Sequence, residues 1–339
     1  MLQGVRWTVP YGHEQLIEEL KQIPGVICRR KGTGCSVRAS VDIADTVEQM
    51  VARPGLRDYS NPLTVDLTRL PLKLHPWQRQ GAEELARGEK LGLFWACGIG
   101  KTSTALSAAI LRDARRVLIV TRAIGRDVWP RDGIWAAEEK NFNIVLGRTV
   151  NGLPSASQIG AMRRATKRLS DLRAKGADVG VDFTVSGSAW ANIVSWETLE
   201  HHKQAILALD PDLVIFDESH YAKGRLATRA ETAREIAKSR LCWLLTATPV
   251  RDRLRDLWGQ LSLSNSSAWG SSWIFVHRYC AAKPGRYGGL DSTGVSNVDE
   301  LKARLAFSFS FHTRREIQHL LPPKPIDIIR LPSKEIDKT

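Results

Sequence analysis

The 339-residue sequence has a formal net charge of +13, from 49 Lys and Arg residues against 36 Asp and Glu residues, and 43% of its residues are hydrophobic. This apolar fraction is enough for one large and one small core, and the charge favours a polyanionic partner such as nucleic acid. No apolar run approaches bilayer length, Met1 does not begin a secretory signal, and the five cysteines lack zinc-site spacing. We therefore expect reduced thiols, no membrane partner, and a cytoplasmic protein, or a nuclear one if the source is a eukaryote.

Residues 1–56 predict a small α+β module. Their pattern of apolar and turn residues indicates a strand, a helix, a hairpin and a second helix, in that order. The four segments are residues 5–10, 13–23, 26–38 and 42–51.

A larger domain is expected after a proline-containing linker over residues 57–71. Apolar strands that alternate with helical segments over residues 72–331 predict one doubly wound parallel sheet with helices on both faces. Within this domain, residues 151–182 have the character of an insertion, because six Arg and Lys residues crowd one predicted helix. The charged helix is either a solvated face or a contact to DNA. Residues 332–339 are expected to be a tail.

A glycine-containing turn follows the apolar strand predicted over residues 91–95. Gly98 and Gly100 permit backbone conformations that other residues avoid, and they turn successive N–H groups toward one centre at the start of a predicted helix. Lys101 would place a cation on the β- and γ-phosphates of a nucleotide, and the Thr102 hydroxyl would bind Mg²⁺. The turn therefore predicts a phosphate cradle, although Trp95 stands where the general pattern has glycine.

Two adjacent carboxylates follow a second apolar strand, residues 213–216. This strand delivers Asp217 and Glu218 to the edge at which open α/β sheets bind ligands. Asp217 would hold Mg²⁺ through water, and Glu218 would orient and deprotonate the attacking water. Paired carboxylates are usually solvated surface, but the apolar strand before them and the cradle upstream favour catalysis.

Further segments complete a pattern along the chain. Gln78 precedes the cradle, an apolar strand over residues 117–121 follows it, and Thr246 and Thr248 come after a fourth apolar strand. This order resembles that of the first RecA-like lobe of superfamily-two motors. The sequence Asp217-Glu218-Ser219-His220 is similar to that of the Swi/Snf-type double-stranded DNA translocases.

The resemblance extends to one branch of that family. The segments that carry it resemble the HARP-type, or annealing-helicase, branch, and residues near the N-terminus resemble the small HARP module. These segments are residues 275–283, 294–301 and 321–324 in the large domain and residues 7–11 and 16–25 in the module.

The resemblance also implies roles for single residues. Gln78 would read the adenine edge, and Thr246 and Thr248 would couple the nucleotide state to nucleic-acid contacts. The residues expected to bind ATP are Gln78, Gly98, Ile99, Gly100, Lys101, Thr102 and Ser103. The residues expected to take part in catalysis are Lys101, Asp217 and Glu218, and those expected to bind the metal ion are Thr102 and Asp217. The residues expected to contact DNA are Arg122, Arg126 and Arg251.

The sequence thus predicts an α/β, RecA-like P-loop NTPase lobe with a small N-terminal α+β module. Its expected function is that of the ATP-binding half of a DNA translocase, with ATP and Mg²⁺ as cofactors and double-stranded or branched DNA as partner. Motors of this class hold ATP between two lobes, so a second RecA-like lobe is expected in a longer chain or in a partner subunit, and this chain alone should hydrolyse ATP slowly. Two alternatives are a helicase-like subunit of a phage or restriction system and a non-catalytic DNA-binding scaffold.

Overall fold

The computed structural model describes residues 4–10, 20–23, 26–31, 34–40, 65–147, 156–223, 228–238, 240–264, 269–285 and 289–320. The predicted helix over residues 42–51, the first part of the linker and the predicted tail over residues 332–339 lie outside these ranges. The boundaries between module, linker and large domain stay predictions.

An eight-stranded sheet forms the centre of the large domain. All of its neighbouring strands pair in parallel. Its strands in spatial order are β13 (Ser310–His312), β4 (Gly92–Trp95), β10 (Leu241–Leu245), β9 (Leu213–Asp217), β5 (Val117–Thr121), β8 (Ala191–Ser195), β6 (Asn141–Val145) and β7 (Asp178–Asp182). The predicted α/β fold with a doubly wound parallel sheet is confirmed.

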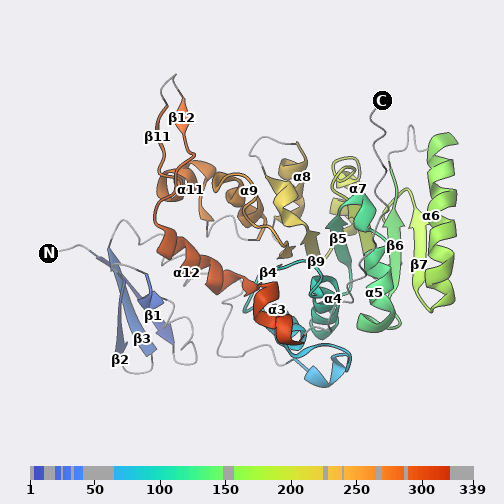
Figure 1. Ribbon diagram of the computed structural model, residues 1–339, viewed down its shortest axis with the longest axis horizontal. Coiled ribbons are helices and arrows are strands. Elements are labelled where there is room, and N and C mark those ends of the chain that lie inside the picture. Colours follow the sequence, from blue (N-terminus) through green and yellow to red (C-terminus); the bar gives the residue numbers. More distant parts are fainter. Residues whose placement is uncertain are drawn as a thin grey trace, which may run out of the picture.

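Helices cover both faces of the sheet (Figure 1). Alternate residues of the strands enter two separate apolar cores: in β9, Leu213 and Ile215 belong to one core, and Val214 and Phe216 belong to the other. The first core is closed by α3 (Pro76–Arg87), α4 (Lys101–Leu111), α5 (Val128–Ala136), α6 (Ala156–Ala174) and α13 (Arg314–Ile317). The second is closed by α7 (Lys203–Leu209), α8 (Thr228–Ala237), α9 (Arg255–Ser264), α11 (Ser272–Tyr279) and α12 (Val298–Ser308).

Strand β13 returns to the sheet beside β4, next to the predicted cradle, and explains the tryptophan at position 95. Trp95 pairs with His312 in the register of the two strands and is fully buried. Its indole Nε1 donates a hydrogen bond of 3.1 Å to Ser310 Oγ. A Cβ at Gly81 of α3 would lie 2.6 Å from the Trp95 ring, so the close approach of α3 to this ring requires glycine there. Trp95 is therefore a core residue that ends β4.

The segment expected to be a basic insertion extends the sheet. It contributes the predicted helix, α6, and also the edge strand β7, whose five residues pair in parallel with β6. The sequence did not predict β7, because only Val179 of this strand is fully buried.

The N-terminal module contains an antiparallel sheet in the order β1-β3-β2, from β1 (Gly4–Pro10), β2 (Val26–Lys31) and β3 (Gly34–Ser40). The predicted first strand and hairpin correspond to these strands. Of the predicted helix before the hairpin, Leu20 and Lys21 are helical and the residues before them lie outside the described ranges. The likeness to a HARP module stays a prediction. Of the helices that the structure describes, none has the length and apolar character needed to cross a membrane.

Candidate functional site

The loop between β4 and α4 has the backbone of a phosphate cradle. Gly98 and Gly100 have φ angles of 77° and 91°, in the left-handed region that favours glycine. A Cβ at Gly98 would meet nothing within 4 Å, whereas a Cβ at Gly100 would lie 1.8 Å from Gln78 Nε2. Helix α4 begins at Lys101, so its first N–H groups and its positive dipole end face the same place.

The side chains of the loop are partly used within the protein. Lys101 Nζ donates hydrogen bonds of 3.0 Å and 3.1 Å to the carbonyl oxygens of Trp95 and Ala96, which holds the ammonium at the end of β4. The Ser103 hydroxyl donates to the Gly100 carbonyl at 3.0 Å, and Ser103 is buried. Thr102 is half-buried beside them. That Lys101 and Thr102 meet a nucleotide stays a prediction.

Asp217 is held in place at the end of β9. Its Oδ2 accepts a hydrogen bond of 2.7 Å from Thr121 Oγ1, at the end of the neighbouring strand β5, and its Oδ1 accepts one of 3.0 Å from the Glu218 N–H. Burial raises the pKa of Asp217 above its ordinary value, and the charge of Lys101 acts in the opposite direction. A half-buried carboxylate near a lysine is suited to a bound cation, which would stabilise its charged form. Sequence reasoning did not find the positioning role of Thr121.

Glu218 has a left-handed backbone, with φ of 48°, and a partly exposed side chain. A hydrogen bond from His220 is the largest cause that holds the pKa of Glu218 below its ordinary value, with the charges of Lys101 and Arg122 acting in the same direction. Glu218 is therefore a carboxylate at neutral pH. A carboxylate that is fixed and accessible can accept a proton from a water molecule.

His220 connects Glu218 to the predicted coupling residues. Its Nδ1 lies 3.3 Å from Glu218 Oε2 and 3.0 Å from Thr246 Oγ1. The same nitrogen lies 3.4 Å from Thr248 Oγ1, and the Thr248 N–H donates to Thr246 Oγ1 at 3.1 Å. The structure thus brings Thr246 and Thr248 to the loop that follows β9 and carries Glu218 and His220. His220 belongs to the motif Asp217-Glu218-Ser219-His220, but its linking position could not be inferred from the sequence.

Gln260 of α9 also links the loop after β9 to the loop after β10. Its Oε1 accepts a hydrogen bond of 2.8 Å from Ser219 Oγ, and its Nε2 donates to the Pro249 carbonyl. Gln260 and Ser219 are both fully buried. A Cβ at the preceding Gly259 would lie 2.3 Å from the Ala222 carbonyl oxygen, so the helix backbone also packs tightly against the loop. Sequence reasoning missed Gln260, because its position in a helix after the last motif gives no signal.

Gln78 contacts the cradle through its amide. Its Nε2 donates to the Ile99 carbonyl at 3.3 Å, and its Oε1 accepts from the His75 N–H at 2.8 Å. The Trp77 indole also donates to the Ile99 carbonyl, at 3.1 Å. Gln78 is buried, so in this conformation the amide fixes the loop. Its role toward adenine stays a prediction.

The three arginines predicted to bind DNA differ in their surroundings. Arg122 is exposed, with its guanidinium 5.5 Å from the centre of the Tyr221 ring, and Arg251 is exposed. Arg126 is half-buried: its Nη1 donates to the Val145 carbonyl at 2.9 Å, its Nε donates to the Ala123 carbonyl at 3.1 Å, and burial lowers its pKa. Arg122 and Arg251 are available to a phosphate, whereas Arg126 fixes two backbone segments. DNA binding by the three stays a prediction.

The residues present fit a nucleotide with a divalent cation. The cradle offers backbone N–H groups and the Lys101 ammonium for phosphates, and Asp217 offers a half-buried oxygen ligand nearby. In the part of the chain that the structure describes, no cluster of three or more His, Cys, Asp or Glu side chains is placed to hold a metal ion. A cation here would take its protein ligands from Thr102 and Asp217, as is usual for Mg²⁺, which keeps water and phosphate oxygens in its shell.

Comparison with known proteins agrees with this geometry. A family model described as "SNF2-related domain" matches residues 164–338, more than half of the chain. The chain belongs to the SNF2-related domain family. It is therefore an SNF2-family ATPase lobe, and the family implies that it binds ATP.

Curated relatives place this SNF2-family lobe near annealing helicases, as its sequence predicts. The chain is 27% identical over 285 residues to the bovine (Bos taurus) DNA annealing helicase and endonuclease ZRANB3. The aligned residues cover 80% of this chain and 24% of ZRANB3. It is 25% identical over 257 residues to the Drosophila melanogaster SWI/SNF-related matrix-associated actin-dependent regulator of chromatin subfamily A-like protein 1, covering 75% of the chain and 29% of that protein. The chain thus spans about a quarter of the length of these relatives.

A solved structure shares the fold. The SWI2/SNF2 ATPase core of Sulfolobus solfataricus in complex with dsDNA aligns with a TM-score of 0.51 at 16% identity, over 73% of this chain and 46% of that chain. The likeness supports the RecA-like arrangement of the SNF2-family lobe.

Proposed function

We propose that this chain is the ATP-binding half of a DNA-dependent ATPase that translocates on, or re-anneals, double-stranded or branched DNA. The observation that carries the proposal is the joining of Glu218 to Thr246 through His220, at 3.3 Å and 3.0 Å, beside the cradle of Lys101. A hydrolytic carboxylate that is connected to a second loop can transmit the nucleotide state to other parts of the protein.

Each side chain of the site has a distinct task in this proposal. Lys101 and the loop N–H groups bind phosphate oxygens, and Thr102 and Asp217 hold Mg²⁺, which neutralises negative charge on the phosphates. Glu218 orients a water molecule and accepts its proton. Thr121 fixes the rotamer of Asp217 through its 2.7 Å hydrogen bond. Gln78 is assigned to the adenine edge, which requires its amide to leave the His75 N–H.

Three observations support DNA as the partner. The chain has a net charge of +13, Arg122 and Arg251 are exposed on loops that follow strands of the sheet, and the similar archaeal ATPase core was solved with dsDNA. Contacts to phosphates would make the binding sensitive to salt and insensitive to sequence. We assign movement along or re-annealing of DNA, not unwinding of long duplexes.

Efficient hydrolysis is proposed to need a second RecA-like lobe. The similar archaeal core is about twice as long as the part of it that this chain matches, which is 46%. In related NTPases, arginines that complete the site contribute roughly 10³ to 10⁵ in rate. A second lobe in the same protein or in a partner subunit would supply such groups.

DNA-stimulated ATP hydrolysis by the whole protein tests the proposal. We expect Glu218→Gln to lower the DNA-stimulated rate by about 10²- to 10⁴-fold while a fluorescent ATP analogue still binds, because only the proton acceptor is removed. Lys101→Ala should weaken binding of the analogue itself. Glu231→Gln, which removes an exposed carboxylate on α8, is the matched control and should behave as wild type. DNA binding without any hydrolysis in the wild-type protein would replace the motor by a non-catalytic scaffold.

A further inference from the structure

Helix α6 presents a cationic face at the end of the sheet that is remote from the cradle. It lies outside β7, the last strand, so that β5, β8, β6 and β7 separate it from β9 (Figure 1). Ala165 and Leu169 are buried in the core beneath it. On the opposite side of the helix, Arg163, Arg164 and Lys167 are exposed. This side therefore has no packing role in the described part of the chain.

The charges on this face are only partly balanced by carboxylates of the same helix, because Asp171 stands four residues after Lys167 but no acidic residue has this spacing to Arg163 or Arg164. Asp171 is the single acidic residue of α6, against five Arg and Lys residues. Among the described residues, no carboxylate forms an ion pair with Arg163, Arg164 or Lys167. Two other arginines are engaged: Arg168 lies 3.8 Å from Asp127, and Arg173 donates to the Val179 carbonyl at 2.9 Å and 2.7 Å.

The spacing of the cations is unfavourable for an isolated helix. Arg163 and Lys167 stand four residues apart, as do Arg164 and Arg168, and like charges at this separation repel each other. A solvated helix usually alternates charges of opposite sign at these positions. The repulsion on α6 is relieved when a polyanion lies along the helix.

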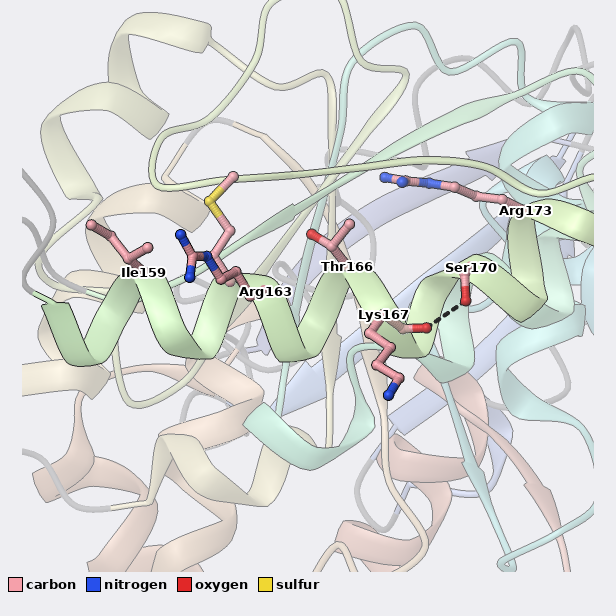
Figure 2. A pocket seen from close by; sticks show the side chains of 7 residues that line it. Ile159, Arg163, Thr166, Lys167, Ser170 and Arg173 are labelled. Atoms are coloured by element: carbon pink, nitrogen blue, oxygen red, sulfur yellow. Dashed lines mark hydrogen bonds between the residues drawn. The ribbon is translucent and has the colours of Figure 1, made fainter.

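A hollow runs along the same helix, with a volume of about 750 Å³. Figure 2 shows Ile159, Arg163, Thr166, Lys167, Ser170 and Arg173 along it. The lining of the hollow is mainly apolar, and the cations Arg163 and Lys167 of the exposed face stand at its side with the Thr166 hydroxyl as a further donor for phosphate oxygens. Helix α6 contains no aromatic residue on which bases could stack.

We propose that the exposed face of α6, formed by Arg163, Arg164 and Lys167, binds the phosphate backbone of duplex DNA. This site is separate from the edge of the sheet that carries the cradle. The absence of base-stacking groups on the helix makes the contact independent of sequence. The site goes beyond the proposed ATPase, because phosphate contacts at α6 need neither ATP nor the catalytic loop. The site on α6 would hold the duplex while DNA contacts at the edge of the sheet that carries the cradle change.

The experiment measures the dissociation constant of the whole protein for a fluorescein-labelled duplex DNA of mixed sequence as a function of KCl concentration. The test variant is Arg163→Gln/Arg164→Gln/Lys167→Gln, which leaves the engaged Arg168 and Arg173 in place. The control variant, Arg115→Gln/Lys238→Gln/Lys302→Gln, removes three exposed cations elsewhere and lowers the net charge equally. We expect the slope of log K against log [KCl] to fall by about 2.7 in the test variant only, since each lost phosphate contact contributes about 0.9.

Three further measurements separate the loss of binding from effects on folding, test whether charge alone is needed, and separate binding from ATP chemistry. Removal of repelling charges should leave the melting temperature unchanged or raise it, and Arg163→Lys/Arg164→Lys, which keeps the charges, should retain the wild-type slope. Lys101→Ala should retain the slope while hydrolysis is lost, so failure of the ATPase proposal would leave the α6 site intact. A test variant with the same slope and dissociation constant as the control variant overturns the proposal.

Discussion

His220 Nδ1 lies between two groups on different loops: Glu218 Oε2 at 3.3 Å and Thr246 Oγ1 at 3.0 Å. A carboxylate only accepts hydrogen bonds, so the hydrogen of the imidazole must be on Nδ1 when it bonds to Glu218. Thr246 Oγ1 also accepts the Thr248 N–H. A movement of the loop after β10 would therefore act on Glu218, the residue that we propose accepts a proton from water.

Substitution His220→Ala should uncouple hydrolysis from DNA. We expect the DNA-stimulated kcat to fall by about 10- to 100-fold, because Glu218 loses the group that orients it. Binding of a fluorescent ATP analogue should change by less than about twofold, since the cradle is untouched. The measurement is steady-state ATP hydrolysis with and without duplex DNA.

Variants of Thr246 provide the controls for this prediction. Thr246→Val removes the hydroxyl and should resemble His220→Ala, whereas Thr246→Ser keeps the hydroxyl and should not. Because the two residues act through one contact, the double variant His220→Ala/Thr246→Val should be no slower than either single variant. Additive losses would show that the contact has no role in coupling.

Gln260→Leu should lower both stability and turnover. The substitution leaves the buried Ser219 hydroxyl without its 2.8 Å acceptor, which costs about 1–3 kcal/mol in the free energy of unfolding. It also removes the hydrogen bond to the Pro249 carbonyl, so Gln260 no longer connects the loops after β9 and β10. The value of kcat should therefore fall, while the affinity for nucleotide should be kept.

Ser262→Ala is the control for Gln260→Leu. Ser262 is buried on the same helix, but its hydroxyl donates only to the Gly259 carbonyl of that helix, at 2.9 Å. Urea unfolding should show a smaller loss for this variant, and its kcat should match that of wild type. Equal turnover in Gln260→Leu and wild type would reduce Gln260 to a packing residue.

The parts of the site that could be predicted from sequence follow apolar strands. In a parallel sheet, strand ends collect at one edge, so the turn after β4 and the carboxylates after β9 were expected to meet. The left-handed φ angles of Gly98 and Gly100 follow from the same local pattern.

The parts that could not be predicted depend on contacts between distant segments. The three residues of β13 are too short for a periodic signal, yet they pair with β4 and pack Trp95 against Gly81. Likewise Gln260 reaches Ser219 across 41 residues of sequence. Hydrophobic periodicity contains no information on such pairs, because they form only when the helices close over the sheet.

His202 should make the free energy of unfolding depend on pH. His202 is 4% exposed, and its Nε2 donates to the Gly147 carbonyl at 2.9 Å. Burial, with the neighbouring His201, lowers the pKa of His202 from its ordinary value of 6.5. The unfolded chain therefore takes up the proton first, so stability is complete above that value and decreases as pH falls toward the folded-state pKa.

Urea unfolding between about pH 7.5 and pH 5.5 checks this dependence. His202→Gln, whose amide can still donate to Gly147, should lose less stability over this range than wild type. His201→Gln makes the same change at an exposed neighbour and should keep most of the wild-type dependence, since burial is the larger cause of the shift. Parallel curves for wild type and His202→Gln would rule out this origin.

A thiol in the cradle loop offers a readout of nucleotide binding that does not require activity. Cys97 is exposed, whereas Cys242 and Cys280 are buried. Burial raises the pKa of Cys242 to about 12 and also raises that of Cys280, so their reactive thiolate forms are scarce at neutral pH.

In a variant with Cys28→Ser and Cys35→Ser, N-ethylmaleimide should therefore react at Cys97, as peptide mass spectrometry can establish. ATP with Mg²⁺ should slow this reaction in a concentration-dependent way, because a nucleotide in the cradle covers the loop that carries the thiol. Addition of Lys101→Ala should abolish the protection while the rate without nucleotide stays the same. If a saturating concentration of ATP leaves the labelling rate unchanged in the Cys28→Ser/Cys35→Ser variant that keeps Lys101, the loop after β4 is not the phosphate site.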